Sequence, residues 1–232
     1  MELDKVENTI IVDELAGKLD YSKLSLNVTT EDVLTACEEA LEYGFANVTV
    51  YPYWVCECVM ALHGQDLTKV GCVIGFPHGK TTLEVKKDEI SMVADFGVDE
   101  VDIVLNQALL KEYPDMSFHE VSDLVKHCKQ KGLVSKIIVE TCFLSEAEKE
   151  LALEICVNSE ADYIKTSTGF GSEGALLADV QFFANPDKNI KVKASGGIKT
   201  LAHTCQLINA GADRIGTSAA VSIVGSFKGR LG

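Results

Sequence analysis

The amino-acid sequence predicts an α/β protein, a single closed (β/α)8 barrel over residues 1–232 with an extra N-terminal helix. Short β-branched segments alternate with amphipathic helical segments along the chain. Successive strand candidates begin roughly 23–36 residues apart, which is the size of one βα unit. A chain of 232 residues is close to the length of a single-domain barrel of eight such units.

The strand candidates follow one another in order, and the first is the weakest. They cover residues 18–21, 46–51, 69–75, 99–105, 135–141, 161–166, 189–194 and 213–216. Helical patterns lie between them at residues 29–44, 81–97, 116–132, 145–159 and 200–211. The first helical pattern opens with a capping threonine and acidic residues and closes on Gly44. Residues 2–16 are amphipathic, and we expect them to form the additional helix that closes the bottom of the barrel.

The faces of the strand candidates favour a closed barrel over an open sheet. In the fourth candidate, apolar residues at positions 101, 103 and 105 alternate with Asp102 and Asn106. In the seventh, apolar residues at positions 190, 192 and 194 alternate with Lys191 and Lys193. An apolar face packed on outer helices and a mixed face lining the interior fit this alternation. A central strand of an open parallel sheet would be apolar on both faces.

Composition limits the compartment and the partners. The formal net charge is -14 and no Lys/Arg cluster forms a basic face, so neither nucleic acid nor an anionic membrane is an expected partner. The N-terminal segment lacks the basic start and apolar run of a signal peptide, and no stretch approaches the ~18 apolar residues of a membrane span. The one close cysteine pair, Cys56 and Cys58, is expected to be reduced and metal-free. These features predict a reduced cytoplasmic protein.

Lys165 is the first candidate for chemistry. It lies near the C-terminal end of the sixth strand candidate, the end at which barrel enzymes carry their active sites. Strand position alone is equally compatible with a surface lysine. Lys193 lies one βα unit later, on the neighbouring strand and the same inward face. Two inward lysines in a low-dielectric interior repel each other, so one becomes a neutral amine able to attack a carbonyl.

Asp102 is the third candidate, because it faces inward on the fourth strand between apolar neighbours. A buried carboxylate needs a partner, and the barrel lysines can supply one. It could then relay protons during the chemistry, whereas the structural alternative is a salt bridge alone. Glu140, which can face inward on the fifth strand, is expected to be an electrostatic partner.

Two glycine-bearing loops predict an anion site. Residues 195–197 (Ser-Gly-Gly) follow the seventh strand, residues 216–218 (Gly-Thr-Ser) follow the eighth, and each opens a helix. Free N–H groups at such helix N-termini suit a phosphate, and barrels commonly build their phosphate pocket from these two loops. Residues 168–171 are expected to add a third edge.

Several runs resemble deoxyribose-phosphate aldolase. They include VDIVLN (101–106), DYIKTSTGFG (162–171), VKASGGIKT (192–200) and AGADRIGTSAA (210–220), within a similarity that continues in order from about residue 19 to about residue 224. The resemblance implies a class I aldolase that needs no metal and no cofactor. It would reversibly cleave 2-deoxy-D-ribose 5-phosphate to D-glyceraldehyde 3-phosphate and acetaldehyde through a lysine Schiff base, in deoxyribonucleotide catabolism. Barrels of this size often dimerise, so a homodimer is a further expectation.

The resemblance also implies roles for particular residues. Lys165 is the Schiff-base lysine, Lys193 lowers its pKa and assists proton transfer, and Asp102 is the proton donor and acceptor. Asp20 would lie near the sugar hydroxyls. The phosphate pocket would be lined by Gly169, Gly196, Gly197, Gly216 and Ser218.

Some positions depart from the family pattern. The N-terminal motif commonly reads I-D-H-T-L-L-K-P, whereas residues 19–26 read LDYSKLSL, so Tyr21 and Ser25 are unusual. Phe170 stands where some members have a phosphate-binding lysine. Two alternatives remain: a catalytically silent phosphosugar-binding barrel that uses Lys165 only as a cation, and another class I aldolase or a transaldolase. The lysine pair with Asp102 argues against the first, and the ordered match to one family argues against the second.

Overall fold

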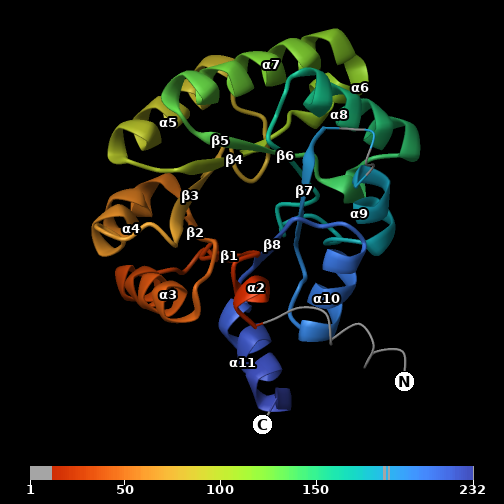
Figure 1. Cartoon of the computed structure of the whole chain (residues 1–232). Helices are drawn as coiled ribbons and strands as arrows, with labels where there is room; N and C mark the ends of the chain where they lie inside the picture. Colours follow the sequence, from red (N-terminus) through yellow and green to blue (C-terminus); the bar gives the residue numbers. More distant parts are fainter. Residues whose placement is uncertain (1–11, 185–186, 188, 232) are drawn as a thin grey trace.

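The computed structural model describes residues 12–184, 187 and 189–231, and it has eight parallel strands closed into a barrel (Figure 1). Each strand pairs with its sequence neighbour, and β1 pairs with β8 to close the ring. The strands are β1 Leu19–Ser22, β2 Asn47–Val50, β3 Lys69–Ile74, β4 Glu100–Val104, β5 Val134–Ile138, β6 Tyr163–Lys165, β7 Lys191–Ser195 and β8 Arg214–Thr217. The predicted (β/α)8 architecture is therefore confirmed.

Helices surround the barrel, as Figure 1 shows. The longer ones are α3 Thr30–Tyr43, α5 Leu83–Phe96, α7 Pro114–Lys131, α8 Glu146–Asn158, α10 Leu201–Asn209 and α11 Ala220–Leu231. The shorter ones are α2 Val12–Ala16, α4 Val55–Ala61, α6 Gln107–Glu112, α9 Leu177–Phe183 and the 3-10 turns η1 Pro52–Trp54 and η2 Thr141–Phe143. Within the described residues, we find no helix whose length and apolar character would let it span a bilayer.

The helix-end signals in the sequence work as expected. Thr29 caps α3 in a capping box with Asp32, and Gly44 ends the helix in the left-handed conformation. The predicted N-terminal helix is seen in part: α2 precedes β1 and packs beside α11, whereas residues 2–11 of the prediction lie outside the described residues (Figure 1). The helical patterns did not indicate α4, α6 or α9, which have only six or seven residues each.

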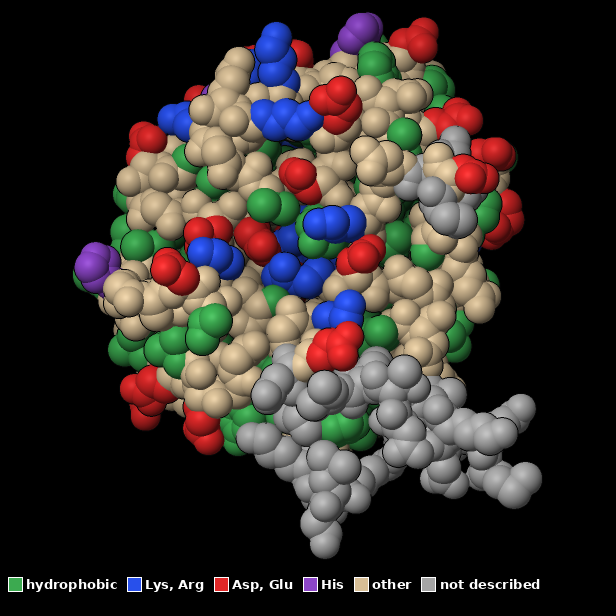
Figure 2. Space-filling view, viewed as in Figure 1, with side chains coloured by type: hydrophobic (Ala, Val, Ile, Leu, Met, Phe, Trp, Pro, Cys, Tyr) green, Lys and Arg blue, Asp and Glu red, His purple; other side chains and the backbone are tan. Residues whose placement is uncertain are grey.

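The strands bury apolar side chains on their outer face and charged ones inside. Val101 and Ile103 pack in the core between sheet and helices, whereas Asp102 between them is fully buried in the barrel interior. Neighbouring strands align Lys165 with Lys193 and Asp102 with Lys136. Figure 2 shows basic and acidic side chains gathered near the centre of the face in view. The closed sheet thus brings charges from distant parts of the chain together.

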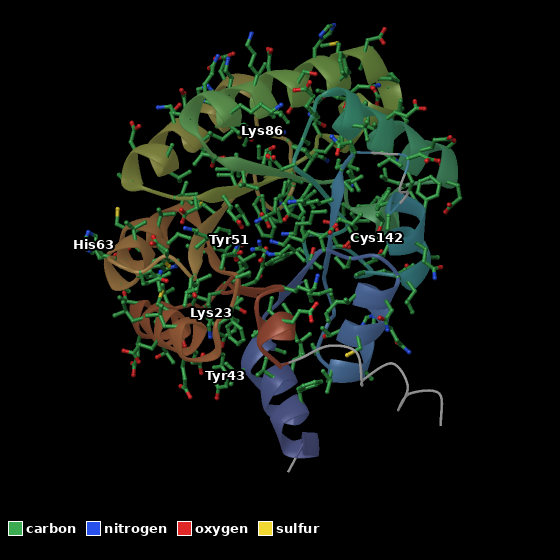
Figure 3. The ribbon with its side chains drawn as sticks, in the orientation of Figure 1. Lys23, Tyr43, Tyr51, His63, Lys86 and Cys142 are labelled. Atoms are coloured by element: carbon green, nitrogen blue, oxygen red, sulfur yellow. The ribbon has the colours of Figure 1, made fainter. Side chains whose placement is uncertain are left out.

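Not every buried lysine belongs to this interior. Lys86 on α5 is fully buried, but it donates to Glu120 on α7 and to the carbonyl oxygen of Val104. Figure 3 shows it near the outer helices, away from the central cluster of side chains. This pair fastens two helices to the sheet and has no contact with the cavity described next.

Candidate active site

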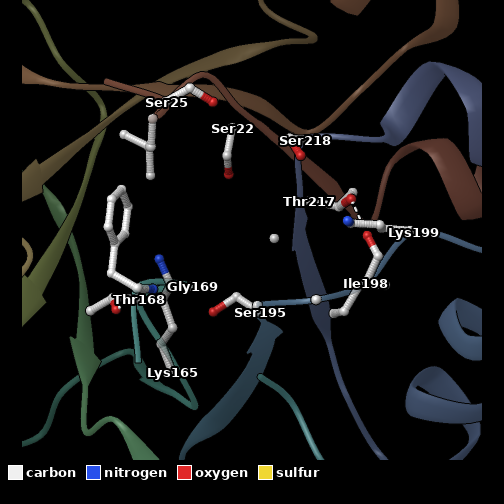
Figure 4. Close-up of a pocket in the computed structure, with 15 residues that line it drawn as sticks. Ser22, Ser25, Lys165, Thr168, Gly169, Ser195, Ile198, Lys199, Thr217 and Ser218 are labelled. Atoms are coloured by element: carbon white, nitrogen blue, oxygen red, sulfur yellow. Dashed lines mark hydrogen bonds between the residues drawn. The ribbon is translucent and has the colours of Figure 1, made fainter. Parts of the chain in front are cut away.

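A cavity of about 350 Å³ opens at the C-terminal ends of the strands. Lys165, the last residue of β6, points into it, and Ser195 at the end of β7 lies beside it (Figure 4). The Lys165 side chain is only 3% exposed, so its amine is reachable only through the cavity. In (β/α)8 barrels this end of the sheet is where chemistry takes place.

Lys165 and Lys193 share one carboxylate oxygen. The Nζ atom of Lys165 lies 2.7 Å from Oδ2 of Asp102, and the Nζ atom of Lys193 lies 2.6 Å from the same oxygen. Both distances are those of charge-assisted hydrogen bonds. The structure therefore brings together the three residues that the sequence singled out, two of them from strands separated by 63 positions in the chain.

The environment makes Lys165 a weak base. Burial and the nearby Lys193 lower its pKa, Asp102 opposes them, and the pKa falls from 10.5 to about 8. Burial is the largest cause, so the like-charge repulsion expected from the sequence is a contribution and not the main one. Burial would raise the pKa of Asp102, but Lys136, Lys165 and Lys193 hold it well below its usual range. Asp102 is therefore a carboxylate, and a proton on Lys165 is weakly held.

Lys136 is one of the charged residues that the sequence reasoning missed, together with Glu100 and Arg214. It is fully buried on β5, with its Nζ atom 3.3 Å from Oδ1 of Asp102 and 3.4 Å from Oδ2 of Asp20, and it also donates to Glu100. Arg214 at the start of β8 donates to Asp20 and to Glu100. Strand parity could have indicated Lys136, because it lies four positions before Glu140, on the face of the fifth strand candidate that we expected to point inward.

Asp20 is placed differently from the expected contact with a sugar hydroxyl. It is fully buried and does not line the cavity, and its Oδ2 atom lies 2.5 Å from the Nζ atom of Lys193. Lys136 and Arg214 also contact it. Burial would raise the pKa of Asp20, but these three cations keep it low, so Asp20 is a buried counter-charge. In the sheet, β1 pairs Asp20 with Gly216 of β8.

The glycine loops form the other side of the cavity, as expected. Residues 195–199 after β7 and 216–218 after β8 line it, together with residues 168–170 after β6. Their backbone approaches closely, since a Cβ atom at Gly174 would lie 2.1 Å from the carbonyl oxygen of Gly196. Gly169, Gly196 and Gly197 all have positive φ angles, which other residues rarely adopt. The five residues predicted for the phosphate pocket all line this one cavity; they are Gly169, Gly196, Gly197, Gly216 and Ser218.

Glu140 holds the loop after β6 in place. Its carboxylate accepts hydrogen bonds from the backbone N–H and the hydroxyl of Thr168, whose own Oγ1 accepts one from the N–H of Phe170. Glu140 has a φ of 55°, an uncommon conformation for a residue other than glycine. Glu140, expected to be an electrostatic partner, therefore has the loop residue Thr168 as its hydrogen-bond partner.

The departures from the family motif lie around the rim. Ser25, Leu24 and Phe170 line the cavity, and the Phe170 ring packs edge-on against Phe76 at 5.5 Å. Tyr21 points away and donates to Glu39 at 2.9 Å. Lys199 also lines the cavity and is exposed, so it offers a cation on the side of the glycine loops. No sequence argument had assigned it.

We searched the described residues for groups of side chains that could bind a metal ion. The described part of the chain holds no group of three or more His, Cys, Asp or Glu side chains arranged to bind a metal ion. Cys58 is buried in the core and Cys56 is exposed on α4, so the close pair in the sequence points in different directions. Neither of them lines the cavity.

A parallel barrel with a buried lysine amine at the floor of a glycine-lined cavity is the arrangement of an enzyme that uses a lysine nucleophile. The model of the DeoC/LacD family of aldolases matches residues 13–230. The chain belongs to this family. A relative from Bacteroides thetaiotaomicron, named deoxyribose-phosphate aldolase, is 40% identical over 97% of this chain and 95% of its own. A relative of the same name from Caldanaerobacter subterraneus is 43% identical over 92% of this chain and 94% of its own.

Solved structures agree with the sequence comparison. The deoxyribose phosphate aldolase from Aeropyrum pernix, described as having a unique tetrameric structure, superposes with a TM-score of 0.90 at 34% identity and covers 97% of this chain and 96% of that one. The solved structure of QR15, described as an aldolase, superposes with a TM-score of 0.87 at 37% identity and covers 94% of this chain and 97% of that one. Fold and family are thus supported independently of any single residue.

Proposed function

We propose that this chain reversibly cleaves 2-deoxy-D-ribose 5-phosphate to D-glyceraldehyde 3-phosphate and acetaldehyde through a Schiff base on Lys165. One observation carries the proposal: the Lys165 amine lies at the cavity floor and shares a carboxylate oxygen with Lys193. An amine with a pKa of about 8 is neutral in a useful fraction of molecules near neutral pH. The choice of substrate is supported by the relatives that are named deoxyribose-phosphate aldolase.

The first step is attack by the neutral amine on the open-chain aldehyde. The nitrogen lone pair of Lys165 bonds to carbon 1, and the carbonyl electron pair moves to oxygen, which takes up a proton. The nitrogen releases its extra proton to give a neutral carbinolamine. The hydroxyl then takes up a second proton and leaves as water, while the nitrogen lone pair forms the iminium double bond. Asp102 is 2.7 Å from the Lys165 nitrogen, so it is within reach to accept and return these protons.

The second step breaks the bond between carbons 2 and 3. The hydroxyl on carbon 3 loses its proton and becomes the aldehyde of D-glyceraldehyde 3-phosphate, while the bonding pair moves into the iminium to form an enamine. Protonation at carbon 2 and hydrolysis then release acetaldehyde and restore Lys165. Lys193 donates to Asp102 and keeps that carboxylate oriented between the two nitrogens.

The glycine loops are the proposed phosphate site. Backbone N–H groups at the starts of α10 and α11 suit an anion, and Lys199 adds a positive charge. Local cations matter here because the chain as a whole carries a net charge of -14. The sugar would lie with its aldehyde carbon at Lys165 and its phosphate at the opposite side of the cavity.

Borohydride trapping tests the covalent step. Incubation with acetaldehyde and then borohydride is expected to reduce the iminium and leave an ethyl group on Lys165, which peptide mapping by mass spectrometry would locate. Lys129, an exposed surface lysine, serves as an internal reference for nonspecific labelling. If Lys165 carried no mass shift, the chain would be better described as a phosphosugar-binding barrel without this chemistry.

A charge placed at the phosphate site should separate phosphate binding from catalysis. Ser218 is exposed on the cavity wall, so Ser218→Asp puts a carboxylate where the phosphate is expected. We expect the KM for deoxyribose 5-phosphate to rise by at least about 10-fold, as expected for repulsion between like charges. The KM for unphosphorylated deoxyribose should stay within about 2-fold, measured in the same coupled assay; equal increases for both sugars would place the phosphate elsewhere.

Assembly and location complete the proposal. The tetrameric description of the Aeropyrum pernix relative supports self-association, and we propose a homo-oligomer of at least two chains in the cytoplasm. Most of the cysteines are buried in the apolar core, which is compatible with a reducing compartment.

A further inference from the structure

Lys165, Lys193 and Asp102 are next to a second set of charges, buried or partly buried, that lies nearer the N-terminal ends of the strands. Lys136, Glu100 and Arg214 come from β5, β4 and β8, and they do not line the cavity. Lys136 contacts Asp102 directly, and Arg214 contacts Asp20, which in turn holds Lys193. We call these three residues the lower layer. Each is one contact away from a residue that touches Lys165 or its partner.

Opposite charges in this interior are equal in number when Lys165 is neutral. The acidic members are Asp20, Glu100 and Asp102, and the basic members are Lys136, Lys193 and Arg214. A proton on Lys165 therefore adds one uncompensated positive charge to a buried cluster. An uncompensated buried charge is costly, so the balance itself favours the neutral amine.

The other groups that face the cluster do not change this balance. Asn47 and Thr49 of β2 are neutral, and Asn47 donates to Glu100 at 2.5 Å. Tyr163 of β6 lies under Lys136, with 5.8 Å between the amine and the ring centroid. Lys191 of β7 also packs over the Tyr163 ring, with 5.5 Å between its amine and the ring centroid. Its side chain is exposed, so water screens its charge.

We propose that Lys136, Glu100 and Arg214 are positioning residues that hold Asp102 and Lys193 in a charge-balanced cluster and so favour the neutral form of the Lys165 amine. The inference rests on the proposed Schiff-base function, and it concerns residues outside the cavity. Lys136 and Glu100 should act with opposite signs. Loss of the Lys136 charge leaves a surplus negative charge that favours protonated Lys165, whereas loss of the Glu100 charge leaves a surplus positive charge that disfavours it.

The test measures the titration of Lys165 directly. Competitive acetylation with a trace of acetic anhydride across pH 6–10, followed by peptide mapping, reports the midpoint at which the Lys165 amine becomes neutral. The variants are Lys136→Met, Glu100→Gln and the double variant, each compared with the parent protein. Lys129→Met and Glu160→Gln serve as matched controls, since these residues form an exposed ion pair of the same types at 2.6 Å.

The two single variants are expected to shift the titration midpoint of Lys165 in opposite directions. Lys136→Met should raise the midpoint by about one pH unit and Glu100→Gln should lower it by about one pH unit, as expected for a charge several ångströms away. At pH 7 these shifts correspond to a reactivity of Lys165 about 10-fold lower and several-fold higher, respectively. The double variant restores the balance, so its midpoint should return to within about 0.3 pH units of the parent. The surface controls should not move it.

Two results would overturn the inference: midpoints that stay in place in both single variants, or a double variant that moves further than either. If Lys136→Met does not fold, the fall in Glu100→Gln and the return in the double variant still decide the question. Trapping with acetaldehyde and borohydride in the parent keeps the two proposals apart. An adduct on Lys165 with unmoved midpoints overturns only the role of the lower layer, and shifted midpoints without an adduct overturn only the proposed reaction.

Discussion

Lys165→Leu is expected to lower turnover of deoxyribose 5-phosphate by at least about 10⁴-fold, the scale of removing a covalent nucleophile. Leucine fills a similar volume but cannot form an iminium, and neither Lys193 nor Lys136 lines the cavity to replace it. The phosphate side of the cavity is untouched, so the variant should still bind the substrate. Stopped assays for glyceraldehyde 3-phosphate and calorimetric titration with the sugar phosphate measure the two effects separately.

Lys129→Leu is the control, because it removes an equal side chain from the exposed surface. Activity within about 10-fold of the parent in Lys165→Leu, in a protein shown by mass spectrometry to carry the substitution, would contradict the covalent mechanism. Loss of both turnover and binding, with a changed circular dichroism spectrum, would show a folding defect instead, and Lys165→Met would then be the informative variant.

Lys193→Leu is expected to lower kcat by at least about 10²-fold at pH 7, the scale of a lost proton-transfer or pKa partner. Lys193 lies between Asp102 and Asp20, at 2.6 and 2.5 Å. Without it, Asp102 is left free to favour the protonated form of Lys165. The pKa of Lys165 then rises above about 8, so the neutral amine is scarcer at pH 7 and the rate is lost.

The pH profile distinguishes this cause from simple misfolding. Because the neutral amine is the active form, part of the lost rate should return as the pH is raised through the new midpoint, measured as kcat from pH 6 to 10. Lys191→Leu is the matched control, two positions earlier on the same strand but exposed. A Lys193→Leu variant with near-normal kcat at pH 7 would refute the coupling between the two lysines.

The barrel could be predicted from the sequence because its strands are regularly spaced and the helices between them have clear end signals. All eight strands lie within about three residues of their expected bounds, and the capped helix α3 matches closely. The short helices α4, α6 and α9 could not be predicted from the sequence, because six or seven residues are too few to show a helical period. Tertiary packing, and not local pattern, decides such segments.

The candidate site was readable where it depends on strand parity and glycine loops. Lys165, Lys193 and Asp102 all face inward at neighbouring positions, as their alternation with apolar residues indicates. The depth of each residue was not readable, since it depends on register around the ring. Asp20 was therefore expected near the sugar hydroxyls but is buried against Lys193 and does not line the cavity, and Lys136 was overlooked although it faces the same interior.

The interior of this barrel also has a consequence for how the protein can be improved. Lys136 and Lys193 are among its largest fully buried side chains, at positions where barrels usually carry branched apolar residues. Apolar replacement of a whole buried ion network is often neutral or stabilising, whereas removal of one partner is strongly destabilising. Selection for thermostability alone would therefore erode the charges that make Lys165 reactive. Directed evolution of this chain should screen activity and stability together, because resistance to heat and turnover depend on the same few positions with opposite preferences.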